Sequence, residues 1–307
     1  MEASNSLDQT QAPLLEALTQ SARRPHAAFY APGHKRGQGI PKRLQALLGE
    51  SVFAADLPEL PELDNLFAPE GAIAQAQALA AAAFGAEQTY FLANGSTCGI
   101  EAAVLAACRP GEKIVVPRNA HQSVVSALIL SGALPVWVQP EYDASWDLVG
   151  AVRPEAVAMA LQQHPDSRAV LVVSPTYQGI CSDLAGIADI AHSYGLPLLV
   201  DEAHGPHFTF HPDLPTPALA AGADLAVQST HKVLSALTQA SMLHVQGDRI
   251  CRQRLQRALQ LTQSTSPSYL LLASLDAARQ QMALEGYSLL SETLNRVLEA
   301  RSHLQHL

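Results

Sequence analysis

A lysine that directly follows a short apolar stretch is the residue of this sequence with the most evident chemical potential. Lys232 ends the run Ser229-Thr230-His231-Lys232, which comes after the predicted strand ADLAVQ. An ammonium group beside a buried strand is costly to desolvate, and the same burial lowers the pKa of an amine. An amine with a lowered pKa is a nucleophile toward an aldehyde. A solvated loop lysine is the simpler alternative, so the context of Lys232 has to decide.

Two acids end another predicted strand, PLLVDEA, and a histidine follows them. Asp201 could pair with the protonated ring nitrogen of a cofactor, because a carboxylate stabilises that positive charge. The alternative is a metal site that combines these two acids, Asp201 and Glu202, with the nearby histidines His204, His207 and His211. Their spacing, H-x2-H-x3-H, matches neither a zinc-finger pair nor the helical H-E-x-x-H motif. The sequence therefore predicts no metal here.

A turn that could hold an anion follows the predicted strand TYFLA. Gly95, Ser96 and Thr97 open the next predicted helix, so the turn offers backbone N–H groups, two hydroxyls and the positive end of a helix dipole. A phosphate group is the natural ligand for such a turn. The alternative is that Ser96 or Thr97 simply caps the helix, which is the everyday use of these residue types.

His121 lies at a further strand end, in the segment RNAHQS after the predicted strand KIVVP. From there its ring could lie flat against an aromatic cofactor ring. A single histidine at such a position is also common on a surface or at a helix N-terminus. The sequence leaves both interpretations open.

A regular alternation of strands and helices separates these candidates, beginning at about residue 71. The predicted strands are TYFLA, KIVVP, LPVWVQ, RAVLVVS, PLLVDEA, ADLAVQS and SMLHVQ. Short apolar runs separated by helices predict an α/β fold with a mainly parallel sheet that helices cover on both faces. Ligands of such sheets bind at the carboxyl ends of the strands, and the candidate residues fall at those ends.

Composition and charge narrow the classes of partner. The net charge of −9 argues against nucleic acid, because no basic field neutralises phosphates, and it suits a small cationic substrate. The N-terminus lacks a secretory signal pattern, and no apolar run approaches the ~20 residues that span a bilayer. We therefore expect a cytoplasmic protein without membrane contact. The cysteines form no C-x-x-C pair and are predicted to be buried free thiols; they are Cys98, Cys108, Cys181 and Cys251.

Several segments together resemble the major domain of the ornithine/lysine/arginine decarboxylase family. They are FYAPGHKRG, FLANGSTCG, VPRNAHQSV, VSPTYQGICSDL, VDEAHGPHF and QSTHKVLSALTQASMLHV, in the family's order, and they cover roughly residues 28–246. STHK with TQAS-x-LH is the most specific of them. The resemblance implies the aspartate aminotransferase-like fold of fold type I enzymes and pyridoxal 5'-phosphate as the cofactor. It also implies a smaller C-terminal domain, which this chain largely lacks.

The resemblance assigns catalytic roles to three residues. Lys232 matches the lysine that forms the Schiff base with pyridoxal phosphate, and Asp201 matches the acid that pairs with the pyridinium nitrogen. His231, or Lys232 itself, would return a proton to the substrate after carbon dioxide leaves.

Further residues match positions around the cofactor or the route to it. Those around the phosphate and the aldimine are Gly95, Ser96, Thr97, Ser229 and His231. Those around the ring are His121, which would stack on it, Ala203 on the opposite face, and His204. His34 and Lys35, in the loop PGHK, match the active-site entrance and lie close to a partner subunit in the family.

The activity that this resemblance implies is decarboxylation of arginine, lysine or ornithine to carbon dioxide and a diamine or agmatine, in a homodimer or larger homo-oligomer. The alternatives are another fold type I reaction, such as that of an aminotransferase or lyase, or a catalytically inactive truncated fragment. The expected segments are an N-terminal arm with the PGHKRG loop, a pyridoxal phosphate-binding major domain, and the helical start of a truncated C-terminal region, at residues 1–45, 46–265 and 266–307.

Overall fold

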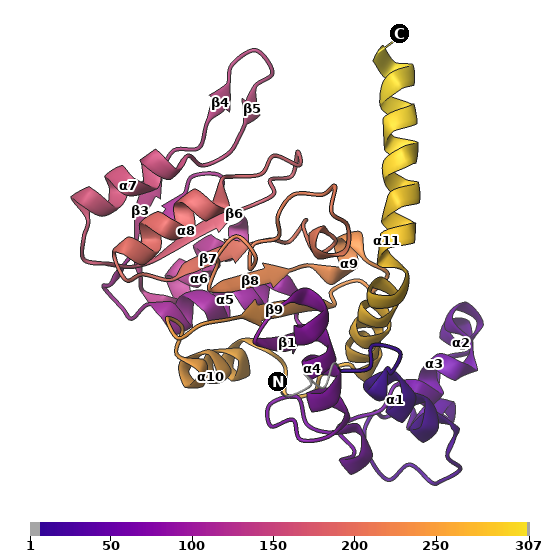
Figure 1. Cartoon of the computed structure of the whole chain (residues 1–307). Coiled ribbons are helices and arrows are strands. Elements are labelled where there is room, and N and C mark those ends of the chain that lie inside the picture. Colours follow the sequence, from indigo (N-terminus) through magenta and orange to yellow (C-terminus); the bar gives the residue numbers. More distant parts are fainter. Residues whose placement is uncertain (1–6, 306–307) are drawn as a thin grey trace, which may run out of the picture.

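A seven-stranded sheet forms the centre of the computed structural model, which describes residues 7–305 (Figure 1). The strand order is β1-β9-β8-β7-β6-β2-β3. Only β9 runs antiparallel to its neighbours within the described residues, so the other six strands point the same way. The bounds are β1 (Gln88–Leu92), β2 (Lys113–Pro117), β3 (Leu134–Val138), β6 (Ser167–Val173), β7 (Leu198–Asp201), β8 (Leu225–Gln228) and β9 (Ser241–Val245). The expected mainly parallel sheet is confirmed.

Helices precede, connect and follow these strands. They are α1 (Pro13–Arg23), α2 (Lys42–Leu48), α3 (Glu50–Ala55), α4 (Ala72–Phe84), α5 (Gly95–Ala107), α6 (Gln122–Ser131), α7 (Pro154–Gln163), α8 (Leu184–Ser193), α9 (Thr230–Val233), α10 (Arg252–Thr262) and α11 (Tyr269–Gln305). The sequence gives no warning of the hairpin formed by β4 (Tyr142–Asp143) and β5 (Leu148–Val149).

Helices cover both faces of the sheet, and apolar clusters fill the two interfaces. On one face α5, α6 and α10 pack over side chains such as Leu92, Val227 and Leu243. On the other face, α7 and α8 cover one half of the sheet and α1, α4 and α11 cover the other half. Strands buried from both sides need apolar residues at consecutive positions. The run KIVVP of β2 meets this need, because Ile114, Val115 and Val116 are all fully buried.

An ion pair with no solvent exposure joins the N-terminal helix to the C-terminal one. Asp276 and Arg279 of α11 bind each other, and Asp276 accepts a hydrogen bond from the backbone N–H of Leu14 at 2.9 Å. Arg279 donates to the carbonyls of Gln9 and Gln11. Parts of the three predicted segments therefore share one core. The segment boundaries stay predictions, and residues 1–6 and 306–307 lie outside the described residues.

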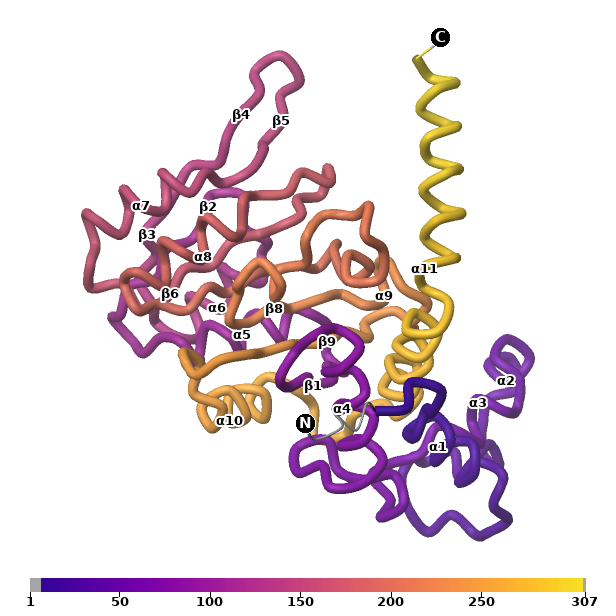
Figure 2. Tube along the Cα trace, viewed as in Figure 1, coloured from indigo at the N-terminus to yellow at the C-terminus, as the bar shows by residue number. Residues whose placement is uncertain are grey.

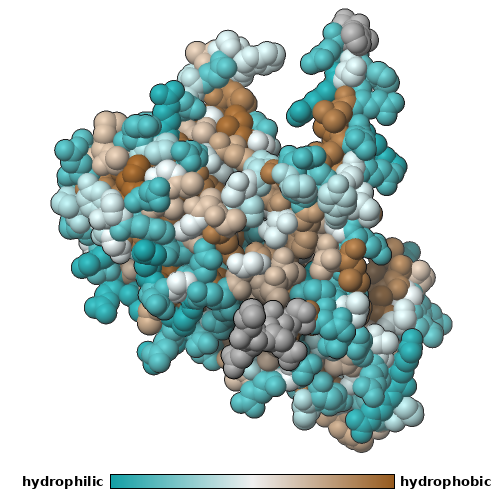
Figure 3. Space-filling model, viewed as in Figure 1, coloured by the Kyte–Doolittle hydropathy of each residue, from teal (hydrophilic) through white to brown (hydrophobic). Residues whose placement is uncertain are grey.

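Two elements extend away from this core. The β4–β5 hairpin and the second half of α11 project from the body of the molecule (Figure 2). The projecting part of α11 carries exposed apolar side chains, among them Val297, Leu298 and Leu304, and Figure 3 shows hydrophobic colour there. None of the helices within residues 7–305 has the length and apolar character needed to cross a membrane.

The cysteine prediction is only partly right. Cys98 and Cys108 are buried, whereas Cys181 is only partly covered and Cys251 is exposed. Cys251 occupies the N-cap position of α10, where the helix begins next to solvent. Its place in a helical stretch therefore did not imply burial.

Candidate active site

The carboxyl ends of three strands bring most of the predicted site residues to one edge of the sheet. Asp201 ends β7, and β8 next to it runs into residues 229–232. The turn after β1 brings residues 95–97 to the same edge. Parallel strands that end together form the crevice in which α/β proteins bind their ligands.

The turn after β1 is built to receive an anion. Gly95 has a φ of +77°, a left-handed conformation that a residue with a side chain rarely adopts. Ser96 Oγ shares a hydrogen bond of 2.7 Å with Ser229 Oγ, which joins the β1 and β8 ends, and Thr97 is exposed. Asn94, at the N-cap position, does not cap α5, because its Oδ1 accepts from the N–H of Ser264 instead. The first N–H groups of α5 therefore stay available to a phosphate.

Asp201 is a buried carboxylate that lacks a bound cation. Its Oδ1 accepts a hydrogen bond from the N–H of Ala203 at 3.2 Å. No ion pair within residues 7–305 includes it. Burial raises the pKa of Asp201, while the nearby His121 and Lys232 lower it. A buried carboxylate needs a charged or hydrogen-bonding partner, and a protonated ring nitrogen fits that need.

Lys232 reaches the same edge of the sheet. Its Nζ lies 3.3 Å from His204 Nε2 and 5.7 Å from the centre of the Tyr177 ring. The side chain is exposed, which matches the solvated alternative that the sequence left open. The reason is the shape of α9, a single turn that buries Thr230 and directs Lys232 outward.

His204 lies beside this amine, and His121 is near enough to affect the pKa of His204 and of Asp201. His204 is half-buried, and burial, followed by the positive charges of Lys232 and His121, lowers its pKa. His121 is exposed, and its Nδ1 accepts a hydrogen bond from the N–H of Ser123 at 3.1 Å, so it caps α6. That is the helix N-terminal placement which the sequence left open. Its proposed stacking on a ring stays a prediction.

His231 and Ala203 lie directly before Lys232 and His204 in the sequence, at the same end of the sheet. The Nδ1 of His231 lies 3.0 Å from the carbonyl oxygen of Ala240, which can only accept, so Nδ1 donates this bond. In a neutral ring the Nε2 of His231 is then free to accept a proton. Ala203 is buried directly after Asp201 and Glu202.

His34 and Lys35 are not brought to this edge. His34 Nε2 lies 3.0 Å from Asp56 Oδ2, and the Lys35 ammonium donates to the carbonyl of Tyr30. Their loop packs against α3, between α1 and α2 in Figure 1. An entrance role for these residues stays a prediction, since nothing within residues 7–305 links them to Lys232.

Two residues at the edge were not singled out from the sequence. Tyr177 is 70% exposed, and its ring centre lies 4.7 Å from that of His204. It follows β6, so its position after a parallel strand was the available signal. Thr230 has a buried Oγ1 that no other described residue binds. Such an unpaired buried hydroxyl is costly, and it belongs to the residue that begins α9 beside His231 and Lys232.

The three histidines considered for a metal lie in different surroundings. His207 has a buried Nδ1 without a partner among the described residues, and burial lowers its pKa to about 4. His211 Nε2 binds Ser291 Oγ, while His204 faces Lys232. No group of three or more metal-binding side chains occurs within residues 7–305.

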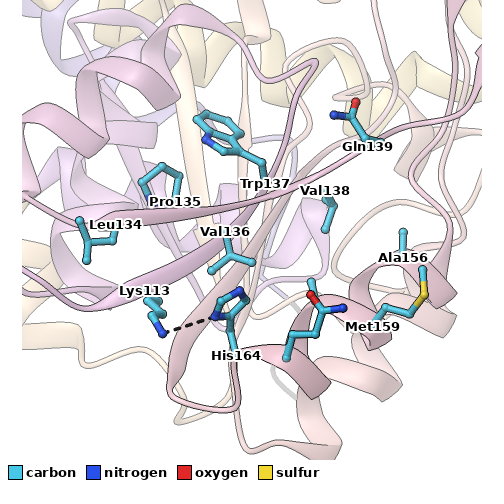
Figure 4. A pocket seen from close by; sticks show the side chains of 12 residues that line it. Lys113, Leu134, Pro135, Val136, Trp137, Val138, Gln139, Ala156, Met159 and His164 are labelled. Atoms are coloured by element: carbon cyan, nitrogen blue, oxygen red, sulfur yellow. Dashed lines mark hydrogen bonds between the residues drawn. The ribbon is translucent and has the colours of Figure 1, made fainter.

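A separate hollow of about 540 Å³ lies at the far edge of the sheet, between β3 and α7 (Figure 4). Its wall includes Trp137 and Met159, together with a hydrogen bond between Lys113 Nζ and His164 Nδ1. It contains no acid and lies at the opposite edge strand from β1. The site at the carboxyl ends of β1, β7 and β8 is therefore the better candidate for chemistry.

Comparisons with known proteins identify the family to which this chain is similar. The family described as "Orn/Lys/Arg decarboxylase, major domain" matches residues 12–307. The arginine decarboxylase of Bacillus subtilis (strain 168) is 42% identical over 301 residues, which are 98% of this chain and 61% of that protein. The lysine decarboxylase LdcA of Pseudomonas aeruginosa is 29% identical over 95% of this chain and 43% of its own length. The chain thus spans less than two thirds of the length of each of these two relatives.

Solved structures give the same picture of the fold. The lysine decarboxylase LdcF of Francisella novicida has a TM-score of 0.86 at 25% identity, covering 97% of this chain and 44% of that one. Lysine decarboxylase A from Pseudomonas aeruginosa has a TM-score of 0.83 at 28% identity, covering 94% and 42%. N-succinyldiaminopimelate aminotransferase from Mycobacterium tuberculosis, at 17% identity and a TM-score of 0.60, shares the fold. The expected aminotransferase-like fold is confirmed.

Proposed function

Because this chain belongs to the Orn/Lys/Arg decarboxylase family, we propose that it forms the cofactor-binding core of a pyridoxal phosphate-dependent decarboxylase of arginine, lysine or ornithine. The observation that carries the proposal is the buried, cation-free carboxylate of Asp201 at the same edge as the Lys232 amine. The Ser96–Ser229 pair supplies the phosphate end of the same site.

The residues present fit this cofactor at both of its ends. The first turn of α5 and the two serine hydroxyls would hold the phosphate. Asp201 would hold the ring nitrogen in its protonated form. When bound, pyridoxal phosphate supplies an electron sink for the bond that breaks at the substrate's α-carbon.

His204 is placed to orient the Lys232 amine. Its lowered pKa keeps the ring neutral near pH 7, so Nε2 can accept a hydrogen bond from the Lys232 ammonium 3.3 Å away. The deprotonated form of the same amine is the nucleophile toward an aldehyde. His231, whose Nδ1 donates to Ala240, keeps Nε2 free to hold a proton near the substrate's α-carbon.

Substrate charge and assembly complete the proposal. The net charge of −9 favours a cationic amino acid over an anionic one at long range. The products are then carbon dioxide and a diamine or agmatine. We propose further that the working form is a homodimer or a larger homo-oligomer.

The exposure of Lys232 favours a second candidate function. This chain would then bind the cofactor without efficient turnover, as an inactive fragment, because water reaches the amine that should be sequestered. An aminotransferase or lyase reaction on the same fold is the remaining alternative.

A cofactor titration followed by product assays tests the proposal. Adding pyridoxal phosphate should produce a visible absorbance band, and borohydride should then fix the cofactor to Lys232, as peptide mass spectrometry would show. Lys232→Ala should lose both signals. Release of labelled carbon dioxide from arginine, lysine and ornithine would establish decarboxylation, and amino-group transfer to a keto acid would point to an aminotransferase. Cofactor bound to Lys232 without either product would identify the non-catalytic form.

A further inference from the structure

A buried chain of polar side chains crosses four neighbouring strands on the sheet face opposite Asp201. Glu202 follows β7, Gln228 ends β8, and His244 and Thr89 pair with each other across β9 and β1. Gln228 Nε2 lies 2.8 Å from Glu202 Oε2, and Gln228 Oε1 lies 3.0 Å from His244 Nε2. His244 Nδ1 lies 2.8 Å from Thr89 Oγ1. All four side chains have at most 2% exposure.

The direction of each hydrogen bond follows from the chemistry of the groups. The N–H of Ala218 can only donate, and it lies 2.7 Å from Glu202 Oε1. Gln228 donates its amide to the other carboxylate oxygen, so its carbonyl must accept from His244 Nε2–H. Burial lowers the pKa of His244 to about 3, so the ring is neutral and its Nδ1 accepts from the Thr89 hydroxyl. Thr89 therefore donates to His244, His244 donates to Gln228, and Gln228 donates to Glu202.

The strands joined in this way are those that carry the candidate active site. Glu202 adjoins Asp201, Gln228 adjoins Ser229, and the strand of Thr89 leads into the turn at Gly95. The side chains of the network and of Asp201 lie on opposite faces, because neighbouring residues of a strand alternate. The network is thus placed to fix the strand ends without touching a ligand.

We propose that the network formed by Glu202, Gln228, His244 and Thr89 is the positioning device that sets the distance between the ring-binding acid, the amine loop and the phosphate turn. The proposal rests on the function proposed above, because it gives these three groups one common ligand. Glu202, Gln228 and His244 are positioning residues in this sense, acting through Asp201, Lys232 and Ser96.

The energetic cost of the network supports a positioning role over simple filling of the core. Glu202 is a buried carboxylate, and no ion pair within residues 7–305 includes it. Apolar side chains would fill the same volume without that desolvation cost. A fully satisfied polar network has only one geometry that pairs all its groups, so it fixes strand spacing more sharply than apolar packing does.

The packing around the network restricts Glu202 and His244 to their observed positions. A Cβ added at Gly205 would lie 2.7 Å from Glu202 Cγ and 3.1 Å from the Phe208 ring. The Phe84 ring stacks on His244 with 4.7 Å between ring centres. The network is therefore enclosed at the Glu202 end and covered over His244.

Exchanging the two partners tests the proposal. Glu202→Gln leaves two amides in contact, which pair only if the Gln228 amide flips and His244 donates from Nδ1 instead of Nε2, and Gln228→Glu places two carboxylates together. In the double variant, the amide introduced at position 202 accepts from Ala218 and donates to the carboxylate introduced at position 228, which accepts from His244. We expect each single variant to raise the pyridoxal phosphate dissociation constant by about tenfold or more, and the double variant to recover to within about threefold.

The affinity is measured by visible absorbance on the cofactor-bound chain, alongside the thermal unfolding midpoint of the cofactor-free chain. Asp224→Asn is the matched control, because this buried carboxylate adjoins the opposite end of β8 and binds His192 and Arg249. It should lower the midpoint and leave the affinity unchanged. Thr89→Val removes only the last hydroxyl, and it should weaken cofactor binding by about twofold to fivefold even if a single variant at position 202 or 228 fails to fold.

The outcomes separate this inference from the function on which it rests. A wild-type chain that does not attach the cofactor to Lys232 overturns the proposed function, and the inference falls with it. If the wild-type chain binds and folded variants at positions 202, 228 and 89 bind as tightly, only the positioning role is overturned. Failure of a folded double variant to recover affinity also overturns it, whereas recovery supports it.

Discussion

Asp201 holds the charge on which the proposed chemistry depends. It is buried, its single side-chain hydrogen bond among the described residues comes from Ala203, and nearby positive charges oppose the effect of burial on its pKa. A carboxylate in this state pairs strongly with a ring N–H⁺ and poorly with a neutral ring. Its contribution is therefore electronic as well as geometric.

Replacing Asp201 by asparagine should separate those two contributions. Asp201→Asn retains the side-chain shape and a hydrogen-bond acceptor, but it does not stabilise a protonated ring nitrogen. We expect carbon dioxide release to fall by about 100-fold or more, while cofactor affinity falls by about tenfold. Rates come from labelled substrate and affinity from the visible band. A variant that turns over at nearly the wild-type rate would contradict the role.

The Ser96–Ser229 pair makes a prediction that concerns the phosphate alone. Ser96→Ala and Ser229→Ala each remove one hydroxyl from the turn, so each should weaken binding of pyridoxal phosphate by about fivefold to twentyfold. Binding of pyridoxal, which lacks the phosphate, should change little. Ser167→Ala, at the start of β6 and nearly as buried as Ser229, serves as the control. Equal losses for both ligands would mean that the serines do not hold the phosphate.

His244 makes the stability of the fold depend on pH. Its pKa in the folded chain is lowered by burial to about 3 from 6.5. A histidine with a lowered folded pKa contributes stability that is present above pH 6.5 and is lost as the pH falls toward 3. Between pH 7 and pH 5 this contribution falls by about 2 kcal/mol.

Urea unfolding of His244→Gln at the two pH values isolates that contribution. The wild-type chain should lose about 2 kcal/mol more than the variant on going from pH 7 to pH 5. The comparison with the variant is needed because Glu202, whose pKa burial raises to about 7, favours the folded state on acidification, and His207 acts in the opposite direction. Parallel pH dependence in the two proteins would show that His244 is not held neutral.

At the scale of the elements, apolar periodicity predicted the strands and most helices well. The run ADLAVQ and the run KIVVP are buried on both faces, and such runs have few other interpretations. The hairpin around Trp146 was missed because its two-residue strands carry no apolar pattern. The sequence left the exposure of Lys232 open because it depends on the direction of a single helical turn.

The network formed by Glu202, Gln228, His244 and Thr89 shows which part of the site cannot be predicted from the sequence. Glu202, Gln228, His244 and Thr89 are distant in sequence, and no spacing rule links them. They meet because β9 lies between β8 and β1, a strand order that periodicity does not determine. The candidate residues at strand ends were accessible to prediction, whereas their support from the opposite face needed the register.

The anchor between α1 and α11 is an element-scale feature with a clear stability prediction. Asp276→Ala leaves the Arg279 guanidinium buried without its anion and removes the acceptor for Leu14 N–H. We expect a loss of about 3–5 kcal/mol in the free energy of unfolding, measured in urea. The double variant Asp276→Leu with Arg279→Met should lose less, because no buried charge remains. A larger loss in the double variant would contradict this account.

At the scale of the whole molecule, the N-terminal region has apolar side chains that no other residue between positions 7 and 305 covers. Helix α2 has no buried residue, although Leu44, Leu47 and Leu48 lie on it, and Leu47 is 79% exposed. Phe29, in the preceding loop, is 94% exposed. Short helices depend on tertiary packing of an apolar face, so α2 needs a surface that a second copy of the chain would provide.

Sedimentation of the full chain tests whether α2 contributes to self-association. We expect a dimer, and we expect Leu47→Ser combined with Phe29→Ser to raise its dissociation constant by about tenfold or more, because two large exposed side chains leave the interface. Leu261→Ser is the matched control, since Leu261 on α10 is 81% exposed and α10 lies away from α2 (Figure 1). If the control dissociates the dimer and the α2 variant does not, association involves another face. A wild-type chain that stays monomeric would show that a second copy of the chain does not cover α2.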